Sequence, residues 1–92
     1  MHPNIQNNIL LSRFEMSISN VIAFINYEKD DNVIYLTHAE VPEIFRNRGY
    51  GSIMIKFVLD LLLKDNYVIV AECPAVKKFV LTNNYYEKVI VD

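Results

Sequence analysis

The spacing of apolar and polar residues divides the first half of the chain into three short extended segments. Residues 13–18 alternate between polar and apolar, which is the period of a strand with one buried face. Residues 21–27 are apolar and often β-branched on both faces, which favours a more central strand. A third strand is predicted over 33–41. Polar turn residues at 19–20 and 29–32 join the three, so the sequence predicts an antiparallel meander.

The period changes after Gly51, where polar residues recur every fourth position and nearly everything between them is apolar. This pattern is typical of a helix with one narrow solvent-facing stripe whose charges pair at i,i+4, formed by Ser52, Lys56, Asp60 and Lys64. A helix buried on most of its circumference packs on the sheet and can also meet a partner chain. We therefore expect a monomer or a weak homodimer.

A short apolar strand is predicted over 67–71, after the long helix. Strand, helix and strand in this order form a right-handed crossover, so this strand is expected to lie parallel to the third. Pro74 at a first helical position predicts a second helix to about Thr82. Residues 85–91 are expected to be a tail or a short final strand. The fold class predicted from this order is α+β.

Size and composition narrow the function classes. The 92 residues suffice for one domain, expected over 9–92 behind a flexible, polar tail at 1–8. Nine basic and eleven acidic residues are well mixed and show no basic face, so no nucleic-acid partner is expected. The apolar runs are shorter than a membrane span of about 20 residues. The single cysteine and the lack of a secretory signal pattern favour a cytoplasmic protein.

The loop Arg46-Asn47-Arg48-Gly49-Tyr50-Gly51 lies between the third predicted strand and the long predicted helix. A helix N-terminus presents unpaired N–H groups and partial positive charge, so anions bind there. The two glycines let a ligand approach the main chain, and the two arginines offer forked donors for phosphate oxygens. The loop is neither a Walker A motif nor the dinucleotide fingerprint. We expect a phosphate site here; the alternative is a glycine-bearing turn with solvated arginines.

The run Arg46-x-x-Gly49-x-Gly51 resembles the Arg/Gln-x-x-Gly-x-Gly/Ala signature of the GNAT superfamily of N-acetyltransferases. Residues 36–42 (LTHAEVP) and Cys73-Pro74 before a helix make the chain similar to a very small GNAT-like family of about this length. The resemblance covers roughly residues 13–85. It implies a GNAT-like fold, acetyl-CoA as cofactor, and loss of the two helices that shape the acceptor pocket in larger members.

The resemblance also implies how coenzyme A would lie. Its pantetheine arm would occupy the gap where the third and last strands splay apart, pairing with main-chain groups of Ala39 and Val41 like an added strand. The thioester would then point toward Cys73. The pyrophosphate would sit in the loop, beside the Arg46 side chain, and accept hydrogen bonds from the main-chain N–H groups of Arg48, Gly49, Tyr50, Gly51 and Ser52.

Cys73, His38 and Glu40 are the candidate catalytic residues. A thiol at a helix N-terminus can be more nucleophilic, and the resemblance makes Cys73 a candidate acyl carrier; the alternative is a buried cysteine that acts as a small apolar residue. His38 and Glu40 are two residues apart and share one sheet face. If Cys73 lies across the splayed strands, His38 can take a proton from its thiol or from the acceptor amine, with Glu40 orienting the imidazole.

The alternative for His38 is a partly exposed strand residue with Glu40 as its ion-pair partner. No metal site is expected, because His2 and His38 are too few and too far apart in the chain for a zinc shell.

One departure from the family bears on catalysis. Larger acetyltransferases often carry a tyrosine on the second helix that protonates the departing CoA thiolate; the nearest equivalent here is Phe79, and Tyr85 follows beyond the helix. The leading hypothesis is an enzyme that moves an acetyl group from acetyl-CoA to an unidentified amine of a small molecule or a protein, directly or through Cys73. The alternatives are a non-catalytic acyl-CoA-binding module and a small interaction protein.

Overall fold

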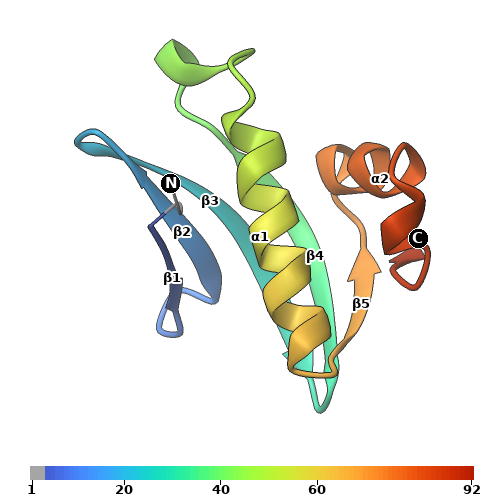
Figure 1. Cartoon of the computed structure of the whole chain (residues 1–92). Coiled ribbons are helices and arrows are strands. Elements are labelled where there is room, and N and C mark those ends of the chain that lie inside the picture. Colours follow the sequence, from blue (N-terminus) through green and yellow to red (C-terminus); the bar gives the residue numbers. More distant parts are fainter. Residues whose placement is uncertain (1–3) are drawn as a thin grey trace.

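A computed structural model of the chain describes residues 4–92 (Figure 1). Its strands and helices follow the order that the hydrophobic pattern predicts, with one additional strand near the N-terminus, and of the two alternatives for residues 85–91 a short final strand forms over Ile90–Val91. In chain order the elements are β1 (Ile5–Asn8), β2 (Arg13–Ile18), β3 (Val21–Asp30), β4 (Val33–Glu40), the short 3-10 helix η1 (Glu43–Phe45), α1 (Tyr50–Lys64), β5 (Val68–Ala71), α2 (Pro74–Leu81), the 3-10 helix η2 (Asn84–Tyr86) and β6 (Ile90–Val91).

Within residues 4–92 the strands form one six-stranded sheet in the order β1-β2-β3-β4-β5-β6. The first four strands pair antiparallel, whereas β5 runs parallel to β4 and β6 parallel to β5. The change of direction occurs where α1 connects β4 to β5, because two parallel neighbours need a crossover connection. The predicted α+β fold is confirmed, with its antiparallel meander, helix, parallel strand and second helix.

Both helices pack against the same face of the sheet and form a single apolar core with it. In β2, β3 and the first part of β4 every second side chain is buried, and these meet the buried side of α1, which includes Met54, Val58 and Leu59. Val76 and Val80 bring α2 into the same core. In Figure 1, α1 lies in front of the sheet. Since side chains of a strand alternate between faces, the other set points to a second face, on which no helix of residues 4–92 packs and which is called here the helix-free face.

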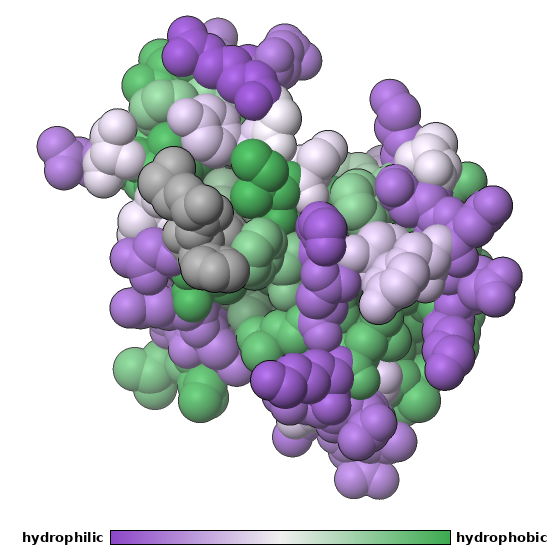
Figure 2. All heavy atoms as spheres, in the orientation of Figure 1, coloured by the Kyte–Doolittle hydropathy of each residue, from purple (hydrophilic) through white to green (hydrophobic). Residues whose placement is uncertain are grey.

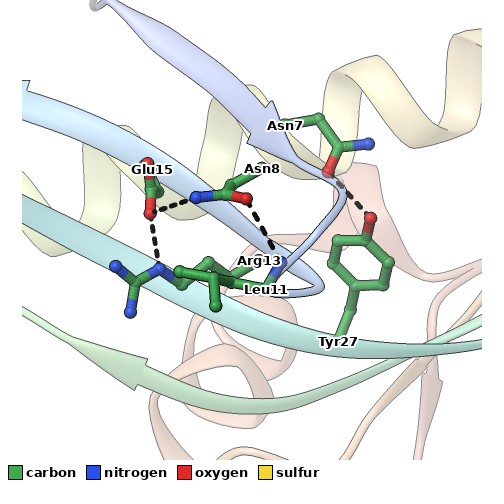
Figure 3. A network of polar contacts seen from close by, with 6 residues as sticks. All are labelled: Asn7, Asn8, Leu11, Arg13, Glu15 and Tyr27. Carbon is green, nitrogen blue, oxygen red and sulfur yellow. Dashed lines mark hydrogen bonds and ion pairs between the residues drawn. The ribbon is translucent and has the colours of Figure 1, made fainter.

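The N-terminal strand differs from the sequence-based expectation. Residues 1–8 were expected to be a flexible tail, and residues 1–3 lie outside the described part of the chain, but Ile5–Asn8 pairs along β2 as strand β1. Asparagine side chains hold it: Tyr27 Oη donates to Asn7 Oδ1 at 2.8 Å, and Asn8 Nδ2 donates to Glu15 Oε2 at 3.1 Å (Figure 3). Polar residues thus fix this strand through partners distant in sequence.

A bulge in β4 changes which residues of that strand face the helices. Asn26 is opposite His38 while its neighbour Tyr27 is opposite Leu36, so Thr37 is an extra residue in the pairing with β3. Before the bulge the even-numbered positions face the helices, and Ile34 and Leu36 are buried there. An extra residue shifts the alternation by one, so the positions facing the helices after it are odd-numbered. Ala39 and Val41 are indeed packed against the core.

Candidate functional site

The loop between β4 and α1 ends in an open helix N-terminus. Its last residue, Gly49, has φ 86° and ψ −2°, a left-handed conformation, and no side chain caps the helix. The first helical bond runs from Ile53 N to Gly49 O. Among the hydrogen bonds of residues 4–92, none has the N–H of Tyr50, Gly51 or Ser52 as donor. These three groups point out of the helix end together, which is the arrangement that binds phosphate oxygens.

The two glycines of the loop differ in what they permit. Gly49 occupies a left-handed conformation that L-residues with a side chain resist, although nothing lies within 4 Å of an added Cβ. Gly51 has no such conformation, and an added Cβ would make an ordinary contact of 3.6 Å with Val41 Cγ2. The backbone conformation of the turn therefore requires glycine at position 49. At position 51 neither the backbone conformation nor the space around it requires glycine.

A cleft of about 340 Å³ opens beside this helix end, at the lower end of the volumes typical of small-molecule sites. The tip of the molecule that carries the loop has hydrophilic residues along its top and apolar residues beside them (upper part of Figure 2). The residues lining the cleft come from the end of β4, the loop and the first turn of α1; they are Val41, Phe45, Arg46, Asn47, Gly49, Gly51 and Ser52.

The two arginines of the loop are held in different ways. Arg46 Nε donates to the main-chain oxygen of Val41 at 2.8 Å, so this side chain closes back over the end of β4. The Arg48 guanidinium carbon lies 5.9 Å from the centre of the Phe45 ring, which in turn meets Tyr50 edge-on at 5.5 Å. Phe45 and Asn47 did not belong to the predicted site. The signal for Asn47 was its residue type, because asparagine at a turn often takes a left-handed backbone conformation, and Asn47 has φ 62°.

The edge of β4 beyond Leu36 is open toward β5. The pairing of the two strands ends at Leu36 with Ala71, and the N–H groups of Glu72 and Cys73 both donate to Leu36 O. Before the bulge, the main-chain N–H and C=O groups of even-numbered residues point toward β5. After the bulge the alternation is shifted by one residue, so the main-chain groups of Ala39 and Val41 point in this direction instead. The structure therefore leaves a gap on this side of β4, in line with the helix N-terminus.

Cys73 lies at the end of this gap where the pairing of β4 and β5 stops, because its N–H donates to Leu36 O. It is the N-cap of α2, with Pro74 as the first helical residue and Lys77 N donating to Cys73 O. Its side chain is only 3% exposed and belongs to the apolar core. The thiol therefore lies on the side of the sheet that the helices cover. This position agrees with the alternative interpretation, in which Cys73 is a buried cysteine that acts as a small apolar residue.

His38 and Glu40 share the helix-free face, where Nε2 of the imidazole lies 3.9 Å from Oε1 of the carboxylate. Both side chains are about half exposed, 56% and 50%. The imidazole also lies near Phe24, with 6.2 Å between ring centres. The structure thus brings His38 and Glu40 together as predicted, but it places them on the face opposite to the buried Cys73 thiol.

The second helix contains no tyrosine that faces the gap. Phe79 packs against Tyr86 with 5.3 Å between ring centres, and Tyr86 Oη donates to Asp60 Oδ1 at 2.7 Å. Tyr85 is 80% exposed and lines a separate hollow with Asp60 on α1. Asp60 is nine residues from Gly51, roughly 14 Å along the helix, so Tyr85 lies far from the loop.

Two further observations concern ions and membranes. Among residues 4–92, no three His, Cys, Asp or Glu side chains come together in a way that could hold a metal ion; His2 lies outside these residues. No helix of the described chain is long and apolar enough to cross a membrane.

Comparison with known proteins adds the family. No curated protein matches the sequence. The family model described as GCN5-related N-acetyl-transferase matches residues 13–89, most of the 92-residue chain. This range runs from β2 to just before β6 and contains the open helix end, the bulge and the gap between β4 and β5. The chain therefore belongs to the GCN5-related N-acetyltransferase family.

Proposed function

We propose that this protein binds acetyl-CoA in the cleft beside α1 and transfers the acetyl group to an amine. In this reaction the amine nitrogen attacks the thioester carbonyl, the new C–N bond forms, and the C–S bond breaks. The amine loses one proton and the departing CoA thiolate takes one up, so no other reactant is needed.

The observation that carries the proposal is the alignment of two sets of unpaired main-chain groups. The N–H groups of Tyr50, Gly51 and Ser52 are free at the start of α1, and the edge of β4 is free beyond Leu36. A pyrophosphate with a pantetheine arm needs both, because its phosphates take N–H donors and its amides pair with a strand edge. A ligand with phosphates alone would use only the first set.

Direct transfer is the route we favour. A covalent route through Cys73 requires its thiol to reach the thioester, and that thiol is 3% exposed within the core. An amine that approaches from the helix-free face instead meets His38 and Glu40, which are half exposed. We assign to His38 the uptake of the amine proton, and to Glu40 the orientation of the imidazole.

A second candidate function is an acyl-CoA-binding module without turnover. Phe79 is the nearest equivalent of the tyrosine that often acts as general acid in larger members, and it has no hydroxyl. The ring of Tyr86 packs against Phe79, but its hydroxyl already donates a hydrogen bond to Asp60. Binding would then proceed as proposed, while the thiolate would lack a proton donor from this region. Under both functions we place the protein in the cytoplasm as a monomer or weak homodimer.

Calorimetric titration with acetyl-CoA, CoA and ATP tests the binding step. We expect both CoA compounds to bind and ATP to bind at least tenfold more weakly. The Gly49→Glu variant should remain folded and lose CoA binding, because a carboxylate would stand where the pyrophosphate is expected. Absence of binding by either CoA compound to the wild-type protein would overturn the proposal.

Amine-dependent release of CoA thiol separates the enzyme from the binding module. Direct transfer predicts that Cys73→Ala keeps most of the activity and that His38→Gln lowers kcat by about 100-fold, within the range for loss of a general base. Intact mass after incubation with acetyl-CoA should show no added acetyl group. An acetyl group on wild-type protein that is lost in Cys73→Ala would establish the covalent route instead.

A further inference from the structure

The outer side of β1 is an unpaired edge of the sheet. β1 is the first strand in the sheet order, and no strand of residues 4–92 pairs with its outer side. Ser17 N donates to Asn4 O at 3.1 Å, so the even-numbered residues of this segment direct their main-chain groups toward β2. The main-chain N–H and C=O groups of Ile5 and Asn7 therefore point away from the sheet.

The edge at β1 lacks the features that usually prevent an edge strand from pairing with another chain. Charged side chains, prolines and bulges are the common ones. The four residues of β1 are Ile-Gln-Asn-Asn, and its pairing with β2 runs without a shift in register. The charged residues of the adjoining strand β2, Arg13 and Glu15, form an ion pair with each other. No uncompensated like charges would therefore meet if this edge paired with itself.

The turn after β1 is apolar and exposed. Turns between strands are usually built from polar residues, glycine and proline. This one carries three consecutive large apolar side chains, with exposed fractions of 75% for Ile9, 96% for Leu10 and 57% for Leu11. Apolar side chains protrude at the lower left of Figure 2, where Figure 1 places this turn.

Polar contacts fix the apolar turn before any partner binds. Asn8 Oδ1 accepts a hydrogen bond from Leu11 N at 3.2 Å (Figure 3), and Ser12 N donates to Ile9 O at 3.2 Å. Ser12 itself has φ 52°, a left-handed conformation that closes the turn. The exposed side chains are thus held in place, so a partner need not order them on binding.

The exposed apolar residues of α1 form no comparable surface. Ile53 and Leu61, exposed by 43% and 44%, are eight residues apart, roughly 12 Å along the helix. The ion pair of Lys56 with Asp60 lies between them along the helix. A contact between copies of the chain is therefore better served by β1 and its turn than by α1.

We infer that two copies of this protein pair antiparallel along β1, about a two-fold axis at Asn7. In this register Asn7 is opposite Asn7 of the second copy and Ile5 is opposite Ile9, so the outward main-chain groups of Ile5 and Asn7 gain partners. Directly opposed residues have their side chains on one face, so the exposed Ile9 would lie beside Ile5, which is partly buried against the core. This contact does not depend on the proposed acetyl transfer.

A second copy fits this edge better than a lipid surface does. Ile5 and Ile9 are evenly spaced about Asn7, as a two-fold axis requires, and the same segment supplies both halves of each pair. A bilayer would take up the apolar turn but would leave the outward N–H and C=O groups of Ile5 and Asn7 without partners.

The size of this contact predicts weak association. Stable interfaces bury about 800 Å² on each partner, from roughly 20–30 residues a side. β1 and the turn supply only the segment Ile5–Leu11 from each copy. We therefore expect a dissociation constant on the order of 10–100 µM, at the weak end of specific contacts.

Sedimentation velocity of the full-length protein from about 5 to about 500 µM tests the association, because this range brackets the expected constant. The average mass should rise from that of one chain toward that of two. In Ile9→Asp/Leu10→Asp the association should weaken about tenfold or more, while Tm stays within about 2 °C because both side chains are exposed. Ile44→Asp/Leu81→Asp, at positions exposed by 68% and 69%, makes the same change in charge elsewhere and should still associate.

Disulfide cross-linking tests the register. In Ile5→Cys/Ile9→Cys the two positions are roughly 13 Å apart along one extended chain, too far for a disulfide within it. Between copies the predicted pairing brings them to about 5.5 Å between Cα atoms, within disulfide range. Mild oxidation should therefore give a covalent dimer of the double variant, while each single variant stays monomeric. The native Cys73 is buried and should not contribute.

Three results would overturn the inference. A wild-type protein that stays monomeric at the highest concentration would exclude the dimer, and a dimer unaffected by Ile9→Asp/Leu10→Asp or not cross-linked in Ile5→Cys/Ile9→Cys would exclude this interface. Binding to phosphatidylcholine vesicles by a monomeric protein, lost in Ile9→Asp/Leu10→Asp, would assign the turn to a lipid surface instead.

Discussion

Arg46 Nε donates a hydrogen bond to the main-chain oxygen of Val41 at 2.8 Å, so two residues assigned to the same ligand bind each other. Val41 is expected to pair with the pantetheine arm, and Arg46 to meet the pyrophosphate. While this bond persists, it occupies one lone pair of the Val41 oxygen and one of the five N–H donors of Arg46, so each group has less to offer the ligand. Binding of coenzyme A is therefore expected to move the Arg46 side chain from the strand to the phosphates.

The Arg46→Ala variant tests this exchange. Loss of a charge-assisted contact to phosphate should weaken CoA binding about tenfold, equivalent to ~1.4 kcal/mol, since part of the contact replaces the bond to Val41. Pantetheine has no pyrophosphate, so its affinity should stay the same or rise slightly as Val41 O becomes free. Calorimetry with the two ligands gives the comparison, and Lys88→Ala is a distant control. An equal loss for both ligands would contradict the exchange.

The two loop glycines should respond differently to alanine. At Gly49, with φ 86°, a side chain strains the backbone by about 1 kcal/mol, which in a domain of this size lowers Tm by about 4–8 °C. At Gly51 the new Cβ has room, 3.6 Å from Val41 Cγ2, and alanine favours the helix, so Tm should hold or rise. Thermal unfolding of both variants measures this. A larger loss at Gly51 than at Gly49 would show that the loop has another conformation.

The sequence predicted the features of the fold that arise from local patterns. The period of four after Gly51 corresponds to α1, and the loop before it lies at the open helix end as expected. What it could not predict depends on contacts between distant residues. The extra residue Thr37 in β4 is visible only against its partner strand. The separation of His38 from the Cys73 thiol follows from which face each strand buries, and no spacing within one segment shows that.

The N-terminal strand is the clearest case of a distant contact overriding local composition. Its residues 6–8 are polar, yet Asn7 and Asn8 reach Tyr27 and Glu15, and Asn8 Oδ1 also accepts from Leu11 N at 3.2 Å (Figure 3). We expect Asn8→Ala to loosen β1 while the rest of the sheet stays intact, because two bonds at the turn are lost.

Hydrogen exchange followed by mass spectrometry measures the loosening of β1. Protection should fall about tenfold over residues 5–8 in Asn8→Ala and stay within twofold in α1. Asn20→Ala, in the turn between β2 and β3, is the matched control and should leave β1 unchanged. Equal loss of protection throughout the chain would mean that β1 and the core open as one unit.

Asp60 links the C-terminal region to α1, and its charge makes this link dependent on pH. Burial tends to raise the pKa of Asp60, but hydrogen bonds from Lys56 and Tyr86 outweigh it and hold the pKa below its ordinary value. Burial and the Asp60 carboxylate raise the pKa of Tyr86. A lowered carboxyl pKa stabilises the fold above about pH 4 and is lost as pH falls. A raised tyrosine pKa stabilises it below about pH 10 and is lost as pH rises.

The Tyr86→Phe variant should therefore be less stable than wild type only between these limits. Near pH 7 we expect a loss of about 1 kcal/mol, at the low end for a bond to a charged group because Asp60 is partly exposed, and a Tm lower by about 4–8 °C. The difference should shrink as the pH falls below 4, because Asp60 takes up a proton in the unfolded chain before it does so in the folded protein. It should also shrink above pH 10, because Tyr86 ionises in the unfolded chain before it does so in the folded protein. Tyr85→Phe, 80% exposed, is the matched control and should match wild type throughout. Thermal unfolding from pH 3 to 10.5 measures both, and a difference that stays constant over this range would show that the loss does not come from the bond to the charged Asp60 carboxylate.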